Sequence, residues 1–281
     1  MAKERFEASA EPCFLVGEAA SRRMLTGAAV RLWGASVPAG ALAMVEGSDG
    51  GLLCPTPAFH LMLRAADLDR VSLLRLAQEF WGTYDTRPDL PSGIAARPAP
   101  LCTRDALRDM AAAVGERYPG KARVEWVIEQ GVDGAASPPE GALGAFFSLG
   151  RRWGGVGAGP VLLNEPVELS DRGRRIVGVG RLRPDILFPD GRLALEYDSE
   201  AHHGTAEARA RDSERKLALE ASGITVFSIG PSVLSSQRRL AALADAVVER
   251  LTGRGEKPLG PGLVEARRRL LTGLLSKEPL F

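Results

Sequence analysis

The sequence predicts a mixed α/β protein, in which a mainly helical part is followed by a sheet with helices packed on it. Three observations predict this. The length of 281 residues allows about two domains. Apolar residues in the first half recur at helical spacing, whereas helix signals alternate with short apolar strands from position 137 onwards. We therefore expect domains at 1–135 and 136–252, followed by a hinge and a basic C-terminal helix at 253–281.

Four stretches of the first part have helical spacing of apolar residues. They span 56–66, Arg70–Trp81, 103–117 and Lys121–Gln130. Thr103 is a suitable N-cap for the third stretch. Short apolar runs at 28–33 and 41–45 indicate small helix or strand pieces, and four prolines and a glycine make 85–100 a linker or long loop.

The second part opens with a helix at 137–149, which begins with a Ser-Pro-Pro-Glu capping box that ends on Glu140. A Pro-Asp-Gly turn joins two of the strands that follow into a hairpin. The later elements are strands at 161–169, 176–179, 183–188 and 192–198, a helix at 205–222, a strand at 224–229, and helices at 232–251 and 263–275. Antiparallel hairpins and a crossover helix indicate one mixed sheet.

Composition excludes several function classes. A net charge of +1 gives no overall field that would draw the chain onto nucleic acid. The three cysteines are scattered, which supports neither a disulfide framework nor a zinc site. No apolar run approaches the ~18–20 residues that a membrane span needs, and residues 1–10 contain no signal-peptide core. We expect a cytoplasmic protein without a membrane partner.

One acidic pattern carries chemistry. Asp185 begins a strand, the tight turn reverses the chain, and Glu196 and Asp198 lie two residues apart on the partner strand. Side chains at i and i+2 share a face, so we expect these three carboxylates to converge. Carboxylates packed together repel one another, and a hard divalent cation removes that penalty. The sequence therefore predicts bound Mg²⁺ or Mn²⁺, which can activate water and stabilise a phosphodiester transition state.

Further candidate residues surround this pattern. His202 or His203, directly after the second strand, is a candidate general base for the attacking water, and Lys216 is another. Glu140 is a candidate fourth carboxylate, although helix capping alone would also explain it. The candidate phosphate contacts are Arg151, Arg152, Arg183 and Arg215.

These motifs resemble the PD-(D/E)xK nuclease superfamily, and in particular a bacterial branch of domains of unknown function related to the very-short-patch-repair endonucleases. The resemblance covers roughly residues 136–234. It is carried by Pro184-Asp185, Glu196-Tyr197-Asp198, His202-His203 and the Asp212-x-x-Arg215 helix. Asp198 stands where the E-x-K motif has its lysine, which leaves the general base open.

The resemblance implies a restriction-endonuclease-like αβββαβ core. It also implies metal ligation by Asp185, Glu196 and the backbone carbonyl of Tyr197, with Glu140 contributing through water. Residues 1–135 are more loosely similar to segments that precede such domains, which have been compared with abortive-infection antitoxins containing a winged helix.

The sequence therefore predicts a metal-dependent endonuclease that hydrolyses phosphodiester bonds, with DNA favoured over RNA. One alternative is a catalytically inactive protein of the same fold that binds nucleic acid, as a regulator or as part of a toxin–antitoxin or phage-defence system. Another is a structural α/β protein whose carboxylates only stabilise a turn with a cation. A homodimer and a separate protein partner both stay open.

Overall fold

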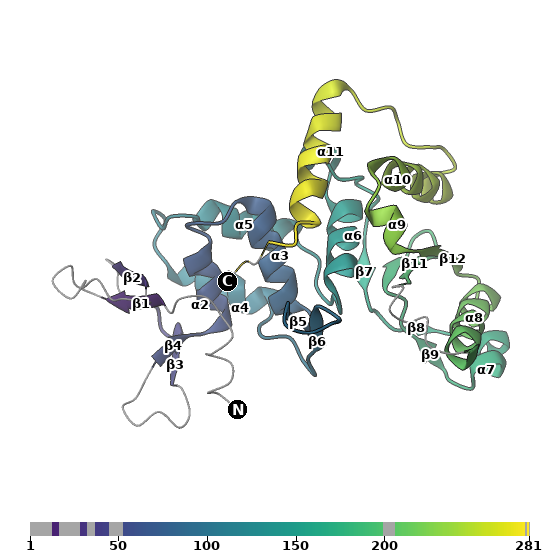
Figure 1. Ribbon diagram of the computed structural model, residues 1–281, viewed down its shortest axis with the longest axis horizontal. Helices are drawn as coiled ribbons and strands as arrows, with labels where there is room; N and C mark the ends of the chain where they lie inside the picture. The colour runs from purple at the N-terminus through teal and green to yellow at the C-terminus, as the bar shows by residue number, and fades with distance from the viewer. Residues whose placement is uncertain are drawn as a thin grey trace.

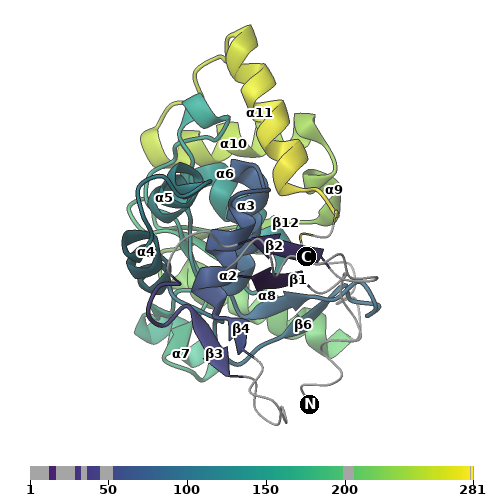
Figure 2. The same ribbon diagram turned by 90° about the vertical axis from the view of Figure 1, so that its left-hand side faces the viewer.

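The computed structural model describes residues 13–16, 29–32, 37–44, 53–198, 206–278 and 280. Helices of the N-terminal part lie on one side, a sheet with its helices lies on the other, and helix α11 (Pro261–Leu274) lies between them (Figure 1). Figure 2 faces the N-terminal part and shows α11 running down beside helices of both parts. None of the helices in this portion of the chain combines the length and apolar character that crossing a bilayer requires.

The predicted helices of the N-terminal part are confirmed. They are α2 (Pro57–Arg64), α3 (Arg70–Trp81), α4 (Arg104–Ala113) and α5 (Lys121–Gln130). Asp69 caps α3 by accepting the backbone N–H groups of Val71 and Ser72, and Thr103 caps α4 as expected.

Within the described residues of this part, the strands pair into three two-stranded sheets. They pair β1 (Cys13–Val16) with β2 (Ala29–Leu32) in parallel, and β3 (Leu42–Met44) with β4 (Leu53–Pro55) and β5 (Tyr84–Thr86) with β6 (Ile94–Ala96) antiparallel. The interpretation of 85–100 as a linker was wrong, because it contains β6 and most of β5. The hairpin is held by Glu79 of α3, whose carboxylate accepts the N–H and hydroxyl of Thr86, each at 2.8 Å.

A four-stranded mixed sheet forms the second part, as expected for the α/β class. Its strand order is β12 (Thr225–Ile229), β11 (Leu193–Tyr197), β10 (Ile186–Phe188) and β7 (Leu162–Leu163). Strand β11 runs parallel to β12 and antiparallel to β10, and β10 runs antiparallel to β7. In chain order, α6 (Pro138–Ser148) comes before β7, β10 and β11, and α8 (Ala206–Ala221) then leads to β12.

Helices cover both faces of this sheet. Phe188 of β10 meets Phe147 of α6 edge-on, at 5.4 Å between ring centroids. On the opposite face, Ala194 and Val226 pack with Ala218 and Leu219 of α8 in a second, smaller apolar cluster. The larger core is one cluster of packed side chains that includes residues from Ala41 to Leu274. It therefore contains residues from both sides of the predicted domain boundary at 135/136.

Two strand predictions in this part were wrong. The strand expected at 161–169 is split into β7 and β8 (Val167–Glu168). The strand expected at 176–179 is instead the end of helix α7 (Asp171–Val177), which precedes β9 (Arg181–Leu182). Ser170 caps α7 by accepting the N–H of Gly173, and the absence of a side chain at Gly173 lets α7 lie close against α8. Local apolar content did not reveal this tertiary contact.

The last predicted helices are present with one change. Instead of a single helix at 232–251, the chain forms α9 (Pro231–Leu234) and α10 (Gln237–Thr252). Ser236 separates them because its hydroxyl accepts the N–H of Arg239 and starts a new helix. Helix α11, expected as a basic helix beyond a hinge, packs its Leu270, Leu271 and Leu274 into the main core.

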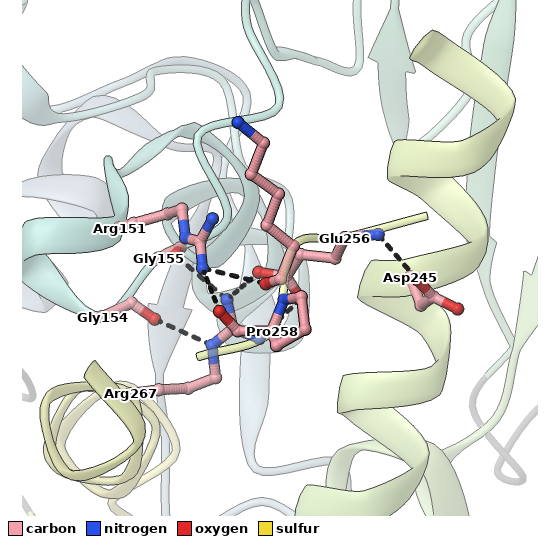
Figure 3. A network of polar contacts seen from close by, with 8 residues as sticks. Arg151, Gly154, Gly155, Asp245, Glu256, Pro258 and Arg267 are labelled. Atoms are coloured by element: carbon pink, nitrogen blue, oxygen red, sulfur yellow. Dashed lines mark hydrogen bonds and ion pairs between the residues drawn. The ribbon is translucent and has the colours of Figure 1, made fainter. Parts of the chain in front are cut away.

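A buried arginine holds α11 to the 3-10 turn η2 (Arg151–Trp153) and the glycines that follow it (Figure 3). The Arg267 guanidinium donates to the Glu256 carboxylate at 2.9 and 2.5 Å, and to the carbonyls of Gly154 and Gly155 at 3.3 and 3.2 Å. A Cβ at Gly154 would lie 2.4 Å from the Ala266 carbonyl oxygen, so glycine permits this close approach. We call Arg267, Glu256, Gly154 and Gly155 the Arg267 clamp.

Candidate functional site

Asp185 and Glu196 lie opposite each other on neighbouring antiparallel strands. The register pairs Ile186 with Leu195, which places Asp185, directly before β10, across from Glu196 of β11. The Pro-Asp-Gly turn makes this possible, since the hairpin closes at Arg192, whose φ is 45°. The backbone N–H of Tyr197 donates to Asp185 Oδ2 at 2.6 Å and fixes that carboxylate at the strand edge. We call Asp185 and Glu196 the acidic pair.

The Glu196 carboxylate is only partly compensated. Its Oε1 is buried and accepts no hydrogen bond from any residue that the structure describes. Its Oε2 lies 4.0 Å from Nη2 of Arg215 in α8, at the limit of an ion pair. The same Nη2 donates to the carbonyl of Arg183 at 3.1 Å, so this nitrogen is shared between the Arg183 carbonyl and the Glu196 carboxylate. A buried carboxylate oxygen without a donor is costly and marks a place where a cation would be stabilised.

Burial and mutual repulsion raise the pKa of both acids. Burial raises the pKa of Glu196 to about 8, with further contributions from the charges of Asp185, Glu140 and Asp212 that outweigh the opposing effect of Arg215. Burial, and secondly the charge of Glu140, raises the pKa of Asp185 to about 6. Both acids therefore hold a proton more tightly than a free carboxyl group, because the charge of Arg215 does not offset burial and the neighbouring carboxylates.

Glu140 faces the acidic pair from the first turn of α6, but donors already surround its carboxylate. Its Oε1 accepts the Ser137 hydroxyl at 2.7 Å, and its Oε2 accepts the Ala136 N–H at 2.9 Å. Half of the predicted capping box is present, because the Ser137 hydroxyl accepts the Glu140 N–H at 3.4 Å, whereas the Glu140 carboxylate accepts the N–H of Ala136 in place of that of Ser137. Glu140 thus caps its helix while its charge acts on Asp185 and Glu196.

Asn164, which was not among the predicted site residues, links Glu140 to Asp185. Its side-chain Nδ2 donates to Glu140 Oε2 at 2.6 Å and to the Gly134 carbonyl at 3.0 Å. Its backbone N–H donates to the Asp185 carbonyl at 3.1 Å, and its φ is 52°. Asn164 is the only asparagine in the sequence, and asparagine tolerates this left-handed conformation better than most residues. That isolated asparagine between two strands was the available signal.

No protein-family model, curated protein or solved structure matches this chain. The site must therefore be interpreted from its own geometry. Within the described ranges, no group of three or more histidine, cysteine, aspartate or glutamate side chains is assembled to hold a metal ion. The acidic pair nevertheless offers hard oxygen donors, including the buried Glu196 Oε1, and oxygen donors of this kind suit Mg²⁺ or Mn²⁺.

Asp198 does not join the acidic pair, contrary to the expected convergence of three carboxylates. Strand β11 ends at Tyr197, and Asp198 is exposed, with its backbone N–H donating to the Ile229 carbonyl at 2.9 Å. The carboxylates that raise the pKa of Glu196 belong to Asp185, Glu140 and Asp212, and Asp198 is not among them. The alternation of a regular strand could not be extended past its last residue.

The other candidates are dispersed. Arg183 is exposed two residues before Asp185, so both it and Arg215 lie close to the acidic pair. Lys216 follows Arg215 on α8, where consecutive residues point about 100° apart. His202 and His203 lie outside the described residues.

Arg151 and Arg152 lie at the opposite end of α6 from Glu140. Arg151 donates to the carbonyls of Lys257 and Pro258 at 2.9 and 3.1 Å, which ties it to the segment before α11 (Figure 3). Arg152 is exposed, with its guanidinium 5.1 Å from the centre of the Trp153 ring. The contacts of Arg151 favour a structural role for it, and neither residue lies at the end of α6 that faces the acidic pair.

Proposed function

We propose that this chain is a metal-dependent nuclease that hydrolyses phosphodiester bonds in DNA at the acidic pair. The observation that carries the proposal is the buried Oε1 of Glu196, which lacks a donor among the described residues, while the charges of Asp185, Glu140 and Asp212 act on the same carboxylate against that of Arg215. A site of this kind is unfavourable for a protein that only folds, and a divalent cation relieves it. The resemblance to the PD-(D/E)xK superfamily at Pro184-Asp185 and Glu196-Tyr197-Asp198 supports the same interpretation.

Asp185 and Glu196 would hold Mg²⁺ or Mn²⁺, with the Tyr197 carbonyl as a further oxygen donor. The bound ion would lower the pKa of water and stabilise the charge that develops on a phosphodiester. The hydrogen bond from Tyr197 N–H to Asp185 Oδ2 orients one carboxylate, and the order of β10 and β11 holds the second beside it.

Arg215 and Arg183 supply positive charge next to the acidic pair. Arg215 is half-buried and lies at the limit of contact with Glu196, so a phosphate oxygen could compete for its guanidinium. Arg183 is exposed beside Asp185, where an arginine can position a nucleic-acid backbone without reading its sequence. His202, His203 and Lys216 remain the candidates for assisting the attacking water.

The test is nicking of supercoiled plasmid DNA with Mg²⁺ or Mn²⁺ by the wild-type chain, Glu196→Gln and Glu220→Gln. Glu220 is an exposed glutamate on α8 and serves as the matched control. We expect Glu196→Gln to lower the nicking rate at least about 100-fold, because a lost metal ligand removes several kcal/mol of transition-state stabilisation. Glu220→Gln should retain the wild-type rate.

Two outcomes would contradict the nuclease proposal. Equal nicking by wild type and Glu196→Gln would place the activity elsewhere or in a contaminant. DNA binding without nicking by any variant would favour the inactive nucleic-acid-binding alternative. Parallel reactions on an RNA of similar length test the DNA assignment, which preferential RNA cleavage would overturn.

A further inference from the structure

Asn164 occupies the point where three segments of the chain meet. It follows β7 directly, and its three donated hydrogen bonds reach the loop before α6, the first turn of α6 and the start of β10. The backbone of Gly134 also lies close to the residue before Asn164, because a Cβ at Gly134 would lie 2.8 Å from the Leu163 carbonyl oxygen. The asparagine thus joins the element that carries Glu140 to the strand that carries Asp185.

The backbone of Asn164 is held in an uncommon conformation. In the described part of the chain, it is one of two non-glycine residues with positive φ, the other being Arg192 in the hairpin turn. At Asn164 this conformation lets the backbone N–H point to Asp185 while the side-chain amide points to Glu140. Left-handed backbone in a residue other than glycine is kept where the surrounding contacts require it.

The amide of Asn164 also determines how Glu140 can act. Glu140 Oε2 accepts from both Asn164 and Ala136, and Oε1 accepts from Ser137. These three donors fix the carboxylate in one orientation, from which its charge acts on both Asp185 and Glu196. Groups that orient the ligands of a metal in this way typically change metal affinity 10–100-fold when they are removed.

We propose that Asn164 is a positioning residue, which holds Glu140 and Asp185 in fixed relation and thereby sets the affinity of the acidic pair for a divalent cation. This inference rests on the proposed metal site, and it adds a determinant that is neither a ligand nor a charged group. The side-chain amide carries the effect, since the backbone hydrogen bond to Asp185 survives any substitution that keeps the local conformation.

The experiment measures the dissociation constant of Mn²⁺ for the full chain by electron paramagnetic resonance, with the melting temperature of each variant recorded alongside. Asn164→Gly keeps the left-handed backbone and the N–H but lacks the amide. We expect Mn²⁺ binding to weaken about 10-fold or more in this variant. Thr103→Ala, which removes the α4 cap far along the chain, is the control for a general loss of stability and should bind Mn²⁺ as wild type does.

Exchanging the donor and the acceptor between positions 164 and 140 separates the effect of the hydrogen bond from the effect of local charge. Asn164→Asp places an acceptor against Glu140 and should weaken Mn²⁺ binding further than Asn164→Gly. Adding Glu140→Gln restores the contact between positions 140 and 164 with reversed direction and leaves the local charge unchanged from wild type. The Ser137 hydroxyl still caps the backbone N–H of position 140, while the Ala136 N–H loses its acceptor, so we expect partial recovery. Recovery of Mn²⁺ affinity in the double variant supports positioning by the hydrogen bond.

The possible outcomes distinguish failure of the Asn164 proposal from failure of the nuclease proposal. Wild-type Mn²⁺ affinity in Asn164→Gly would overturn the positioning role while leaving the nuclease proposal intact, provided that plasmid nicking persists. Equal weakening in Thr103→Ala and Asn164→Gly would show only a stability effect and would also overturn it. Failure of the wild-type chain to bind Mn²⁺ would overturn both proposals.

Discussion

The Arg267 clamp and the acidic pair bury charge in opposite ways. In the clamp, one guanidinium meets one carboxylate and two backbone carbonyls, and both charged side chains are about nine-tenths buried. At the acidic pair, half-buried Arg215 lies only at the limit of an ion pair with Glu196, the charges of Asp185, Glu140 and Asp212 oppose it, and one oxygen of Glu196 is left without a donor among the described residues. The clamp is complete in itself. The acidic pair has a carboxylate oxygen without a donor that could accept a cation, which supports its proposed role in binding one.

The largest effect on stability is expected at the clamp. Arg267→Met leaves the Glu256 carboxylate buried and unpaired, and removing one partner of a buried pair costs about 3–5 kcal/mol. Urea unfolding should show a loss of this size in the free energy of unfolding. Adding Glu256→Gln should recover part of it, because the uncompensated charge is then gone. A loss below about 1 kcal/mol in the single variant would show that the clamp contributes little.

The acidic pair should behave in the opposite way, because neutralising it stabilises the fold at alkaline pH. The pKa of Glu196 rises from 4.5 to about 8 on folding, so the folded state holds this proton more tightly than the unfolded chain does. Stability should therefore fall as pH rises from about 4.5 to 8, by roughly 2–4 kcal/mol. Asp185, with its pKa of about 6, adds a smaller fall between about 4 and 6.

Unfolding measured across this pH range should give a flatter stability profile for Glu196→Gln than for the wild type. The exposed Glu220→Gln serves as control and should keep the wild-type slope. Parallel profiles for wild type and Glu196→Gln would show that the glutamate is not strained by its surroundings.

A divalent cation should relieve the same strain. At pH 8, Mg²⁺ or Mn²⁺ at about 100 times its dissociation constant should stabilise the wild-type chain by about 2–3 kcal/mol, seen as a higher melting temperature. Glu196→Gln should lose most of this shift, whereas Arg267→Met should keep it on a lower baseline. An equal shift in Glu196→Gln would place the cation elsewhere.

The smallest effect belongs to exposed charges on the same helix as the clamp. Glu265 accepts hydrogen bonds from Arg268 at 2.8 Å and from Arg269 at 2.7 Å, and these contacts lower the pKa of Glu265 to about 2. Because both arginines are exposed to solvent, which screens their attraction to Glu265, Arg268→Met should leave the free energy of unfolding close to the wild-type value. A clear loss would weaken the distinction between buried and exposed pairs on which the comparison depends.

Local sequence signals predicted the regular elements well. Helices α3 and α5 have the expected bounds, because a capping aspartate or a Pro-Gly break lies beside a clear apolar period. Strand β11 and the turn before it were also expected, which placed Asp185 and Glu196 together. These features depend on neighbours within a few residues, which a single sequence displays.

Several of the errors involve contacts between residues far apart in the sequence. The β5–β6 hairpin contains an ion pair between Arg97 and Asp85, and the close packing of α7 depends on Gly173 against α8. Asn164 acts through residues 24 and 30 positions away. A single sequence shows the residue types but not which distant residues come into contact. The candidate metal ligands could therefore be predicted, and the residues that support them could not.

The position of α11 also has a consequence in time. Gly273 lies against Val71 of α3, and Leu271 and Leu274 pack near Phe146 of α6, so α11 completes the core of both parts. The ribosome makes α11 roughly 110 residues after α6, a delay of about 6–20 s at ordinary synthesis rates. Throughout that interval the apolar surfaces of α3 and α6 that pack against α11 in the folded protein have no partner helix. Apolar surface that stays exposed on a nascent chain for that time favours association with other chains or with chaperones.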